Sequence, residues 1–264
     1  MWPWISFEGF HIPSFLLIQC LNAVLLLVWA RARAQQLELP PRQGLDLTFL
    51  VLFTGLIGGR LLHVFWESPN LYWSQPMTIF SLTSGGYTYF GGLLLALPIS
   101  WLYLQRLHEP KGPWFDFAAP LASAGTAIGR IGCLLAGCCY GRVCDLPWAL
   151  PFWDDQGLRL LRHPTQLYSV IWELGILALL LGLEKTPLAE RPRWIRQPGA
   201  LFGVWIAFHS LGRFFIEFLR DDFRGPQYFL SLSQWLSLCA LILSCLILRQ
   251  TSRHQSEIRQ KPAK

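Results

Sequence analysis

The sequence predicts an all-α, polytopic membrane protein with about seven transmembrane helices, and three observations lead to that class. Hydrophobic residues make up 53% of the 264-residue chain and charged residues only 14%, against about 25% in average soluble domains. Mean hydropathy is +0.36. Several stretches also reach the roughly 20 mostly apolar residues that a helix needs to cross a bilayer. These properties exclude an ordinary soluble domain.

Seven such stretches follow one another along the chain. The first, fifth and seventh are strongly apolar runs, so hydropathy supports them directly. The other four contain Gly, Arg, His or Glu. These residues lower the hydropathy of the spans, and ionisable residues inside a span indicate a functional site. The expected spans are Pro13–Ala30, Leu47–Trp66, Tyr87–Leu104, Phe115–Leu135, Thr165–Leu183, Gly199–Leu219 and Tyr228–Leu248.

The basic residues between the spans predict the orientation. One side of the membrane holds Arg142, Arg159, Arg162, Arg220 and Arg224, whereas fourteen Lys and Arg residues fall on the other side. The positive-inside rule then predicts an outside N-terminus and a cytoplasmic C-terminus. The first span follows no basic segment, so a cleaved signal peptide is not expected. We expect one transmembrane domain over residues 1–248 and a basic, disordered cytoplasmic tail over 249–264.

Several charged side chains fall inside the expected spans, where each costs about 2.5–3.5 kcal/mol on an insertion scale. They are Arg60, Arg130, Glu173, Arg213 and Glu217, with Arg220 at the outer edge of the sixth span. Arg213 and Glu217 are four residues apart and therefore share one helix face. A salt bridge that serves only membrane insertion is one explanation of this pair.

The carboxylates are too few to neutralise the four arginines, even if Glu173 pairs with one of them. In a bilayer the group that completes the balance is a lipid phosphate, which a planar guanidinium binds through parallel hydrogen bonds. The net charge of +6 is explained by the cytoplasmic loops and tail, so a nucleic-acid partner is not expected.

The stretch "IGRIGCLLAGCCYGR", residues 128–142, surrounds Arg130 with glycines. Gly125 and Gly129 have the small-xxx-small spacing that lets two membrane helices pack closely. The glycines that continue through Gly132 to Gly141 weaken a helix. They could therefore free backbone N–H groups to bind a phosphate beside Arg130. Helix packing and phosphate binding both fit the sequence.

The loop before the fifth span contains "RHPTQLY", residues 162–168. Pro164 fits the first turn of the helix that follows. His163 precedes this proline, and its imidazole could serve as a general base, a ligand or a helix cap.

The seven cysteines fall into two groups. Cys20, Cys239 and Cys245 lie in apolar spans, where we expect small buried hydrophobic residues. The others form the pattern C-x4-CC-x4-C and are Cys133, Cys138, Cys139 and Cys144. This spacing differs from the C-x2–4-C pairs of structural zinc sites, so no metal is expected. A disulfide such as Cys139–Cys144 is an alternative in an oxidising compartment.

Five motifs, in this order, resemble those of the prolipoprotein diacylglyceryl transferase family. They are "GGRLLHV" (58–64), "GGLL" (91–94), "GRIGCLLAGCCYGR" (129–142), "RHPTQLY" (162–168) and "GRFFIEFLR" (212–220). The resemblance covers roughly residues 45–248, and the combination of motifs is specific. The seven spans and outside N-terminus that it implies agree with the topology above.

The resemblance implies a transferase of the bacterial inner (plasma) membrane. The diacylglyceryl group of phosphatidylglycerol would pass to the thiol of the lipobox cysteine in a prolipoprotein, and glycerol phosphate would leave. The implied partners are phosphatidylglycerol, prolipoprotein signal peptides with a lipobox cysteine and other membrane lipids. The implied reaction needs no metal and no soluble cofactor.

The resemblance also implies roles for residues of this chain. The expected catalytic residues are Arg213, Glu217 and His163. Guanidinium groups that grip the leaving phosphate bind it more strongly as negative charge develops, and His163 or Glu217 could take the proton that the thiol must lose. The residues expected to bind substrate are Arg130, Gly129, Gly132, Gly141, Arg60, Arg220, Gln166 and Tyr168.

The chain departs from the family pattern on the proton-transfer side. Phe90 stands directly before "GGL", where the family usually has a His. Cys133 and Cys138 stand where Asn and Glu are common, and Ser169 stands where a Glu follows "QLY". Two alternatives therefore remain. One is a divergent member that keeps an anionic-lipid pocket but has lost or altered the transferase activity. The other is a membrane thiol oxidoreductase, although C-x-x-C is absent.

Overall fold

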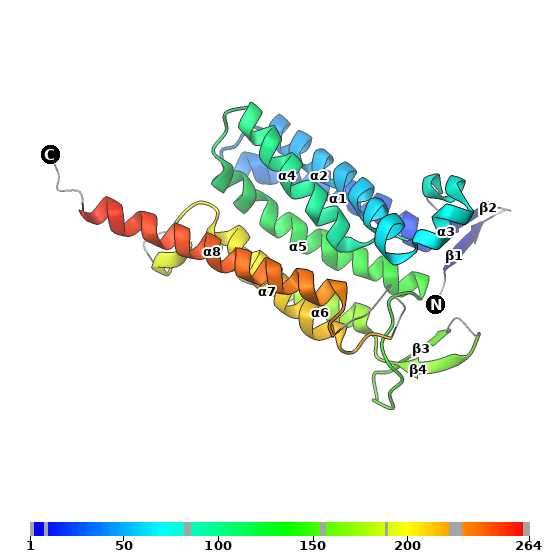
Figure 1. The fold of residues 1–264 in the computed structure, drawn as a ribbon. Coiled ribbons are helices and arrows are strands. Elements are labelled where there is room, and N and C mark those ends of the chain that lie inside the picture. The colour runs from blue at the N-terminus through cyan, green and yellow to red at the C-terminus, as the bar shows by residue number, and fades with distance from the viewer. Residues whose placement is uncertain are drawn as a thin grey trace.

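The structure is a computed structural model that describes residues 3–7, 10–81, 86–153, 157–187, 190–221 and 229–260. It is an elongated bundle of helices with two small β-hairpins at one end, which we call the hairpin end (Figure 1). β1 lies at the hairpin end and the last turns of α8 at the opposite end. The all-α class is confirmed for the bundle, and the hairpins are short additions that hydropathy did not predict.

Within the described residues, seven long helices build the bundle. They are α1 (Ser14–Gln36), α2 (Pro41–Leu62), α4 (Tyr89–Arg106), α5 (Lys111–Ala136), α6 (Thr165–Lys185), α7 (Ala200–Glu217) and α8 (Leu232–Gln260). Short helical turns are η1 (His63–Glu67), α3 (Pro69–Ser74), η2 (Pro76–Phe80) and η3 (Arg193–Ile195). Strands β1 (Trp4–Phe7) and β2 (Phe10–Pro13) form one antiparallel hairpin, and β3 (Leu150–Trp153) and β4 (Arg159–Arg162) form the other.

Six of the described helices are long and apolar enough to cross a membrane. The chain is therefore a multi-pass membrane protein, as predicted. The remaining expected span, Tyr87–Leu104, corresponds to α4, which has 18 residues, contains Pro98 and ends in Gln105 and Arg106. Its polar end explains why α4 is not among the six, although it lies beside α2 in the bundle (Figure 1).

Glycines allow α2 and α4 to cross with their backbones in contact. A Cβ atom at Gly58 would lie 2.3 Å from the carbonyl oxygen of Gly91, and a Cβ at Gly91 would lie 2.3 Å from that of Gly58. A Cβ at Gly92 would likewise lie 2.8 Å from the Gly55 carbonyl oxygen. Only glycine permits this approach, which fixes the end of α2 against the start of α4.

The glycines of α5 pack against α1. A Cβ at Gly129 would lie 3.3 Å from Gln19 Nε2, and a Cβ at Gly132 would lie 3.3 Å from the Ile18 Cβ. α5 stays helical through Ala136, so the N–H groups of both glycines belong to the hydrogen-bond ladder of the helix. The structure thus shows close helix packing at Gly129 and Gly132, and their expected role in substrate binding stays a prediction.

Polar side chains close the end of the bundle opposite the hairpins. Arg33 of α1 pairs with Glu184 of α6, and its Nε donates to the Phe117 carbonyl at 2.8 Å. Asp116 accepts the backbone N–H of Gly199 at 2.7 Å, and it also accepts an N–H in the first turn of α7. The Asp116 carboxylate thus satisfies backbone donors that the start of α7 would leave unpaired.

α8 extends beyond the expected seventh span. It continues to Gln260, so residues 249–260, expected to be disordered, are helical in the structure. A helix already formed in an apolar segment adds further turns without a new nucleation step. The expected start of the span at Tyr228 and residues 261–264 lie outside the described residues.

Candidate active site

α5 ends in a turn that folds the signature cysteines back toward the helix. The N–H groups of Gly137 and Cys138 donate to the carbonyls of Leu134 and Cys133, both at 3.1 Å, which is the Schellman pattern of helix ends. Gly137 has a φ of 73° and Cys139 a φ of 66°. Left-handed backbone is uncommon for a residue with a side chain, so the conformation of Cys139 must be held by its surroundings.

Hydrogen bonds from Thr165 and Gln166 of "RHPTQLY" fix the backbone at Cys138 and Cys139. Thr165 Oγ1 donates to the Cys139 carbonyl and Gln166 Nε2 donates to the Cys138 carbonyl, both at 2.5 Å. Both side chains are almost completely buried. Gln166 thus positions the loop after α5 through its Nε2, and its expected contact with substrate stays a prediction.

Gly141 lies where three chain segments cross. A Cβ at Gly141 would lie 2.6 Å from both the His163 Cβ and the Leu219 carbonyl oxygen. Its N–H donates to the His163 carbonyl at 2.9 Å, and the N–H of Arg142 donates to the Leu219 carbonyl at 2.8 Å. The glycine is needed for this crossing, and its expected role in substrate binding stays a prediction.

α7 brings Arg213 and Glu217 together at the hairpin end. Arg213 Nη1 lies 2.5 Å from Glu217 Oε2, and each side chain is 6% exposed. Arg213 Nη2 donates to Ser233 Oγ at 3.1 Å, and Ser231 Oγ donates to Glu217 Oε1 at 2.9 Å. Within the described part of the chain, Arg213 Nε has no hydrogen-bond acceptor. The predicted pair is confirmed, and one guanidinium donor is left for another acceptor.

Arg130 and Arg220 extend the positive cluster. Arg130 is half-buried on α5, and no described residue forms a hydrogen bond or ion pair with its guanidinium. Arg130 and Arg220 both act electrostatically on Arg213, and Arg220 Nε lies 4.0 Å from Glu217 Oε2. The structure thus brings together three of the four arginines that the sequence singled out.

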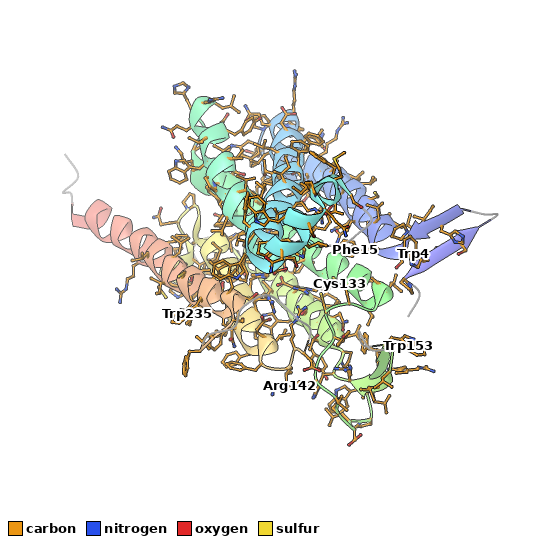
Figure 2. All side chains as sticks on the ribbon, turned by 45° about the vertical axis from the view of Figure 1, so that its right-hand side comes forward. Trp4, Phe15, Cys133, Arg142, Trp153 and Trp235 are labelled. Carbon is orange, nitrogen blue, oxygen red and sulfur yellow. The ribbon has the colours of Figure 1, made fainter. Side chains whose placement is uncertain are left out.

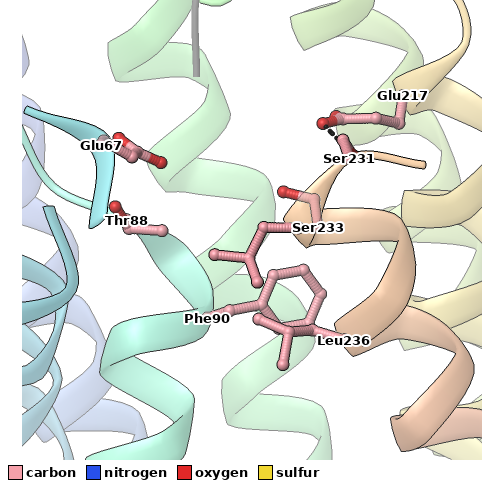
Figure 3. Close-up of a pocket in the computed structure, with 8 residues that line it drawn as sticks. Glu67, Thr88, Phe90, Glu217, Ser231, Ser233 and Leu236 are labelled. Carbon is pink, nitrogen blue, oxygen red and sulfur yellow. Dashed lines mark hydrogen bonds between the residues drawn. The ribbon is translucent and has the colours of Figure 1, made fainter. Parts of the chain in front are cut away.

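A small cavity opens beside this cluster (Figure 3). Its walls are Glu67, Thr88, Phe90, Glu217, Ser231, Leu232, Ser233 and Leu236. Glu67 and Thr88 lie on one side of the cavity, and Glu217 and Ser231 lie on the other. Two carboxylates therefore face the same space, and Phe90 contributes an apolar wall.

Glu67 lines this cavity and was not among the residues expected from the sequence. Its Oε2 lies 3.8 Å from His63 Nε2, and His63 Nδ1 lies 2.9 Å from the Tyr72 hydroxyl. None of the ion pairs among the described residues joins Glu67 to an arginine. The spacing of four residues between His63 and Glu67 was a usable signal, since the same spacing identified Arg213 and Glu217.

Arg60 binds the loop that follows α3. Its guanidinium donates to backbone carbonyl oxygens of Thr78, Ile79, Ser81 and Gly86. The Tyr72 and Tyr87 rings lie with their centroids 5.3 and 5.2 Å from Arg60 Cζ. These contacts order the loop, and the expected role of Arg60 in substrate binding stays a prediction.

His163 and Tyr168 form a separate contact. His163 Nδ1 lies 3.1 Å from the Tyr168 hydroxyl, which also accepts a hydrogen bond from Trp148 Nε1 at 2.8 Å. Neither residue is among the described residues that line the cavity. Among the described residues no hydrogen bond or ion pair joins His163 to Arg213 or Glu217, and Tyr168 bonds to Trp148 and His163.

Glu173 pairs with a histidine and not with an arginine. Glu173 Oε1 lies 2.5 Å from His209 Nδ1, and Ser123 Oγ donates to Glu173 Oε2 at 3.0 Å. The Tyr89 ring lies over His209, with centroids 4.9 Å apart. Sequence analysis missed His209, although an ionisable side chain inside a span was the signal.

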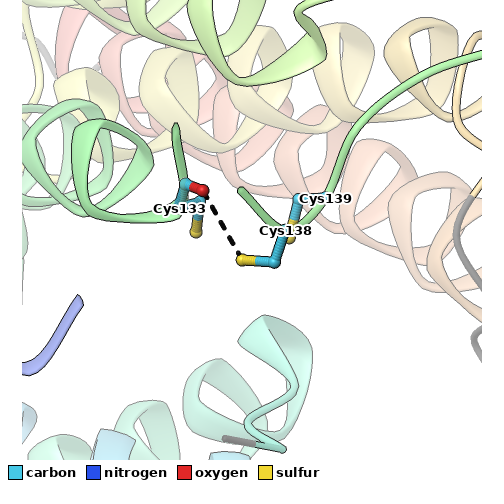
Figure 4. A group of neighbouring side chains, drawn as sticks. All are labelled: Cys133, Cys138 and Cys139. Carbon is cyan, nitrogen blue, oxygen red and sulfur yellow. Dashed lines mark hydrogen bonds between the residues drawn. The ribbon is translucent and has the colours of Figure 1, made fainter. Parts of the chain in front are cut away.

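Three thiols of the signature meet at the end of α5 (Figure 4). The sulfurs of Cys133, Cys138 and Cys139 all lie within 4.8 Å of one another. Hydrogen bonds from Cys133 and Cys138 lower the pKa of the Cys139 thiol well below its usual range, and the nearby Arg220 and Arg130 add to this shift.

The remaining cysteines differ from what the sequence suggested. None of the seven described cysteines is in a disulfide, so the structure does not show the alternative of a Cys139–Cys144 bond. Cys20, Cys239 and Cys245 are exposed on the helix surfaces and not buried, because the apolar faces that carry them point out of the bundle. A surface of this kind suits contact with lipid.

Together these features define a class: a multi-pass membrane protein with a cluster of arginines and two carboxylates beside a small cavity. The chain belongs to the prolipoprotein diacylglyceryl transferase family, because the sequence model of that family matches residues 4–249.

Individual relatives agree with this membership. Proteins named phosphatidylglycerol–prolipoprotein diacylglyceryl transferase are similar to the chain over most of its length. The protein of Azoarcus sp. is 37% identical over 89% of this chain and 89% of its own length. That of Bordetella avium is 36% identical over 79% and 78%, and that of Cupriavidus pinatubonensis is 34% identical over 80% and 75%.

Proposed function

We propose that this protein transfers the diacylglyceryl group of phosphatidylglycerol to the lipobox cysteine thiol of prolipoproteins in the bacterial inner membrane. Glycerol phosphate is the other product. The relatives are named for phosphatidylglycerol and prolipoprotein. The observation that carries the proposal is the cluster of Arg130, Arg213 and Arg220 at the hairpin end of the bundle.

Arg130 and Arg213 bind the phosphate in this proposal. Arg130 has no hydrogen-bond or ion-pair partner among the described residues, and Arg213 keeps a free Nε donor there. Glu217 orients Arg213 through their ion pair, and Arg220 adds positive charge at the edge. When the bond between glyceryl carbon and phosphate oxygen breaks, the phosphate gains negative charge, and these guanidinium groups stabilise it most at that moment.

Glu67 takes the proton of the attacking thiol. Glu217 already serves Arg213, and His163 lies with Tyr168. Glu67 lines the same cavity as Glu217, and His63 and Tyr72 stand behind it. This assignment replaces the proton acceptors expected from the sequence and accounts for transfer with Phe90 in the wall of the cavity.

The test is direct transfer. Membranes that contain the protein are incubated with a lipobox peptide and phosphatidylglycerol labelled in its glyceryl and acyl parts, and the lipidated peptide is measured by mass spectrometry. Arg130→Ala and Arg213→Ala should abolish transfer, whereas Arg159→Ala, an exposed arginine of β4, should not. Absence of transfer by the unsubstituted protein, where an active relative works in parallel, would refute the proposal and favour a lipid-binding member with altered chemistry.

A further inference from the structure

The thiol cluster of Cys133, Cys138 and Cys139 has the geometry of a metal site. Zinc–thiolate bonds of about 2.3 Å place the sulfurs of a tetrahedral site about 3.8 Å apart. The three sulfurs lie within 4.8 Å of one another, so a small inward movement brings them to that spacing. The sequence spacing concealed this arrangement, because it is the turn at Gly137 and the left-handed Cys139 that bring the sulfurs together.

The charge around the three sulfurs fits an anionic metal site. Arg130 and Arg220 both act electrostatically on Cys139. Three thiolates with one divalent zinc-type cation carry a net charge of −1, which two neighbouring guanidinium groups offset. Three sulfur ligands and no carboxylate also select a soft or borderline metal such as zinc over magnesium or calcium.

The site is held in place and can be reached. Thr165 and Gln166 bind the carbonyls of Cys139 and Cys138, so the loop is fixed by a buried second layer of contacts of the kind that orients metal ligands. Cys138 is exposed, which gives an ion a path to the sulfurs. Left-handed backbone at a residue with a side chain is a conformation that clusters at functional sites.

We propose that Cys133, Cys138 and Cys139 bind a zinc-type divalent cation, and that its open fourth position takes the thiol of the acceptor peptide. Structural zinc sites have four protein ligands, whereas catalytic sites keep three and leave one position open. The described cysteines offer three, since Cys144 is not part of the cluster. This inference rests on the proposed function for its substrate but not for its metal.

The cation deepens the proposed reaction in a specific way. A thiol that coordinates zinc is deprotonated, and its proton passes to the Glu67 carboxylate, on which Cys139 acts electrostatically. The peptide sulfur then forms a bond to the glyceryl carbon. The bond from that carbon to the phosphate oxygen breaks, and its electron pair leaves with glycerol phosphate. The thioether product is a weaker ligand than the thiolate and leaves the fourth position.

Metal binding is measured first on the purified full-length protein in detergent. After removal of metals by a chelator under reducing conditions, Zn²⁺ should bind at one ion per chain, and Co²⁺ should give a thiolate-to-cobalt absorption band. Bound zinc should also protect Cys133, Cys138 and Cys139 from N-ethylmaleimide, with each site read by mass spectrometry. This protection assay needs no variant. Failure of the unsubstituted protein to bind either ion would overturn the proposal.

Variants locate the ligands. Cys133→Ser, Cys138→Ser and Cys139→Ser should each weaken zinc binding by at least about tenfold, the smaller end of the effect seen when metal sites are altered. Cys144→Ser is the matched control, since it removes a nearby thiol outside the cluster, and it should bind zinc as before. Equal affinity in all four variants would place the ion elsewhere and contradict the site.

The open position is tested with peptide binding, separately from lipid transfer. A lipobox peptide should shift the cobalt spectrum, and the same peptide with Ser for Cys should not. No shift with either peptide would overturn the open position. If the spectrum shifts and no lipid is transferred, the metal site stands and the proposed function fails. If transfer proceeds unchanged with the metal removed, the role of the cation in the reaction fails and the proposed function stands.

Discussion

His209 Nδ1 lies 2.5 Å from Glu173 Oε1, and both side chains are about 5% exposed within the membrane-spanning part of the bundle. Removal of one partner leaves the other buried without its hydrogen-bond partner, which costs about 1–3 kcal/mol. His209→Ala should therefore lower the thermal unfolding midpoint of the protein in detergent, measured by intrinsic tryptophan fluorescence.

The double variant His209→Leu, Glu173→Leu is the control for this prediction. It removes both polar groups together and should recover much of the lost stability, since replacing a buried pair by apolar residues is often neutral. A double variant no more stable than His209→Ala would contradict the view that the unpaired group causes the loss.

Gly91→Ala should destabilise the protein because its methyl group would lie 2.3 Å from the Gly58 carbonyl oxygen. The helices must then separate, and overpacking of this kind costs about 1–3 kcal/mol. The measurement is the thermal unfolding midpoint, together with lipid transfer, since α4 carries Phe90 of the cavity.

Gly175→Ala is the matched control for Gly91→Ala. Gly175 lies inside α6 with nothing within 4 Å of an added Cβ, and alanine is a better helix residue than glycine by about 0.5–1 kcal/mol. The thermal unfolding midpoint of Gly175→Ala should therefore rise or stay unchanged. A similar fall in both variants would show that the close crossing of α2 and α4 is not the cause.

Arg213→Lys should lower the rate of lipid transfer by about 10²–10³, the effect of losing one donor that stabilises developing negative charge. Lysine keeps the charge but lacks the planar fork that reaches both Glu217 and a phosphate. Transfer at saturating lipid is the measurement. A rate equal to that of the unsubstituted protein would show that charge alone suffices at this position.

Glu67→Gln should reduce transfer at neutral pH while leaving phosphatidylglycerol binding unchanged. The amide fills the same volume but cannot accept the thiol proton. The charged and titratable groups that act on Glu67 are His63, Arg220 and Cys139, with Glu217 across the cavity. Partial rescue of this variant by Phe90→His would support proton transfer in this cavity, whereas full activity of Glu67→Gln would contradict it.

Cys139 should react with iodoacetamide at a lower pH than an ordinary cysteine, in metal-free protein. Because its pKa is lowered, the thiolate persists as the pH falls, and the reaction slows only below the folded-state pKa. The same residue in the unfolded chain provides the reference profile. Arg220→Gln removes one source of the shift and should move the folded profile toward higher pH, and an unmoved profile would exclude a contribution from Arg220.

The sequence predicted the bundle well because the length and apolarity of each span are local properties. The Arg213–Glu217 pair was predictable for the same reason, since four residues on a helix fix a shared face. Contacts between distant segments were not predictable. The Glu173–His209 pair joins α6 to α7, and Gly141 meets both His163 and Leu219, so these roles depend on how the helices pack. The spacing of the cysteines did not predict that three of their sulfurs lie together. The left-handed turn at the end of α5 brings these sulfurs together, and sequence spacing does not reveal such a turn.

Arg60 has an evolutionary consequence. Its guanidinium donates to the backbone oxygens of Thr78, Ile79, Ser81 and Gly86 after α3, and every amino acid supplies the same oxygen. Selection on this contact therefore preserves the arginine and the path of the loop but not the side chains of Thr78, Ile79 or Ser81. Gly86 is the exception, because it has a φ of 80° and a Cβ there would lie 2.6 Å from the His63 ring. Relatives should vary freely along this loop and keep its length, its arginine and this one glycine.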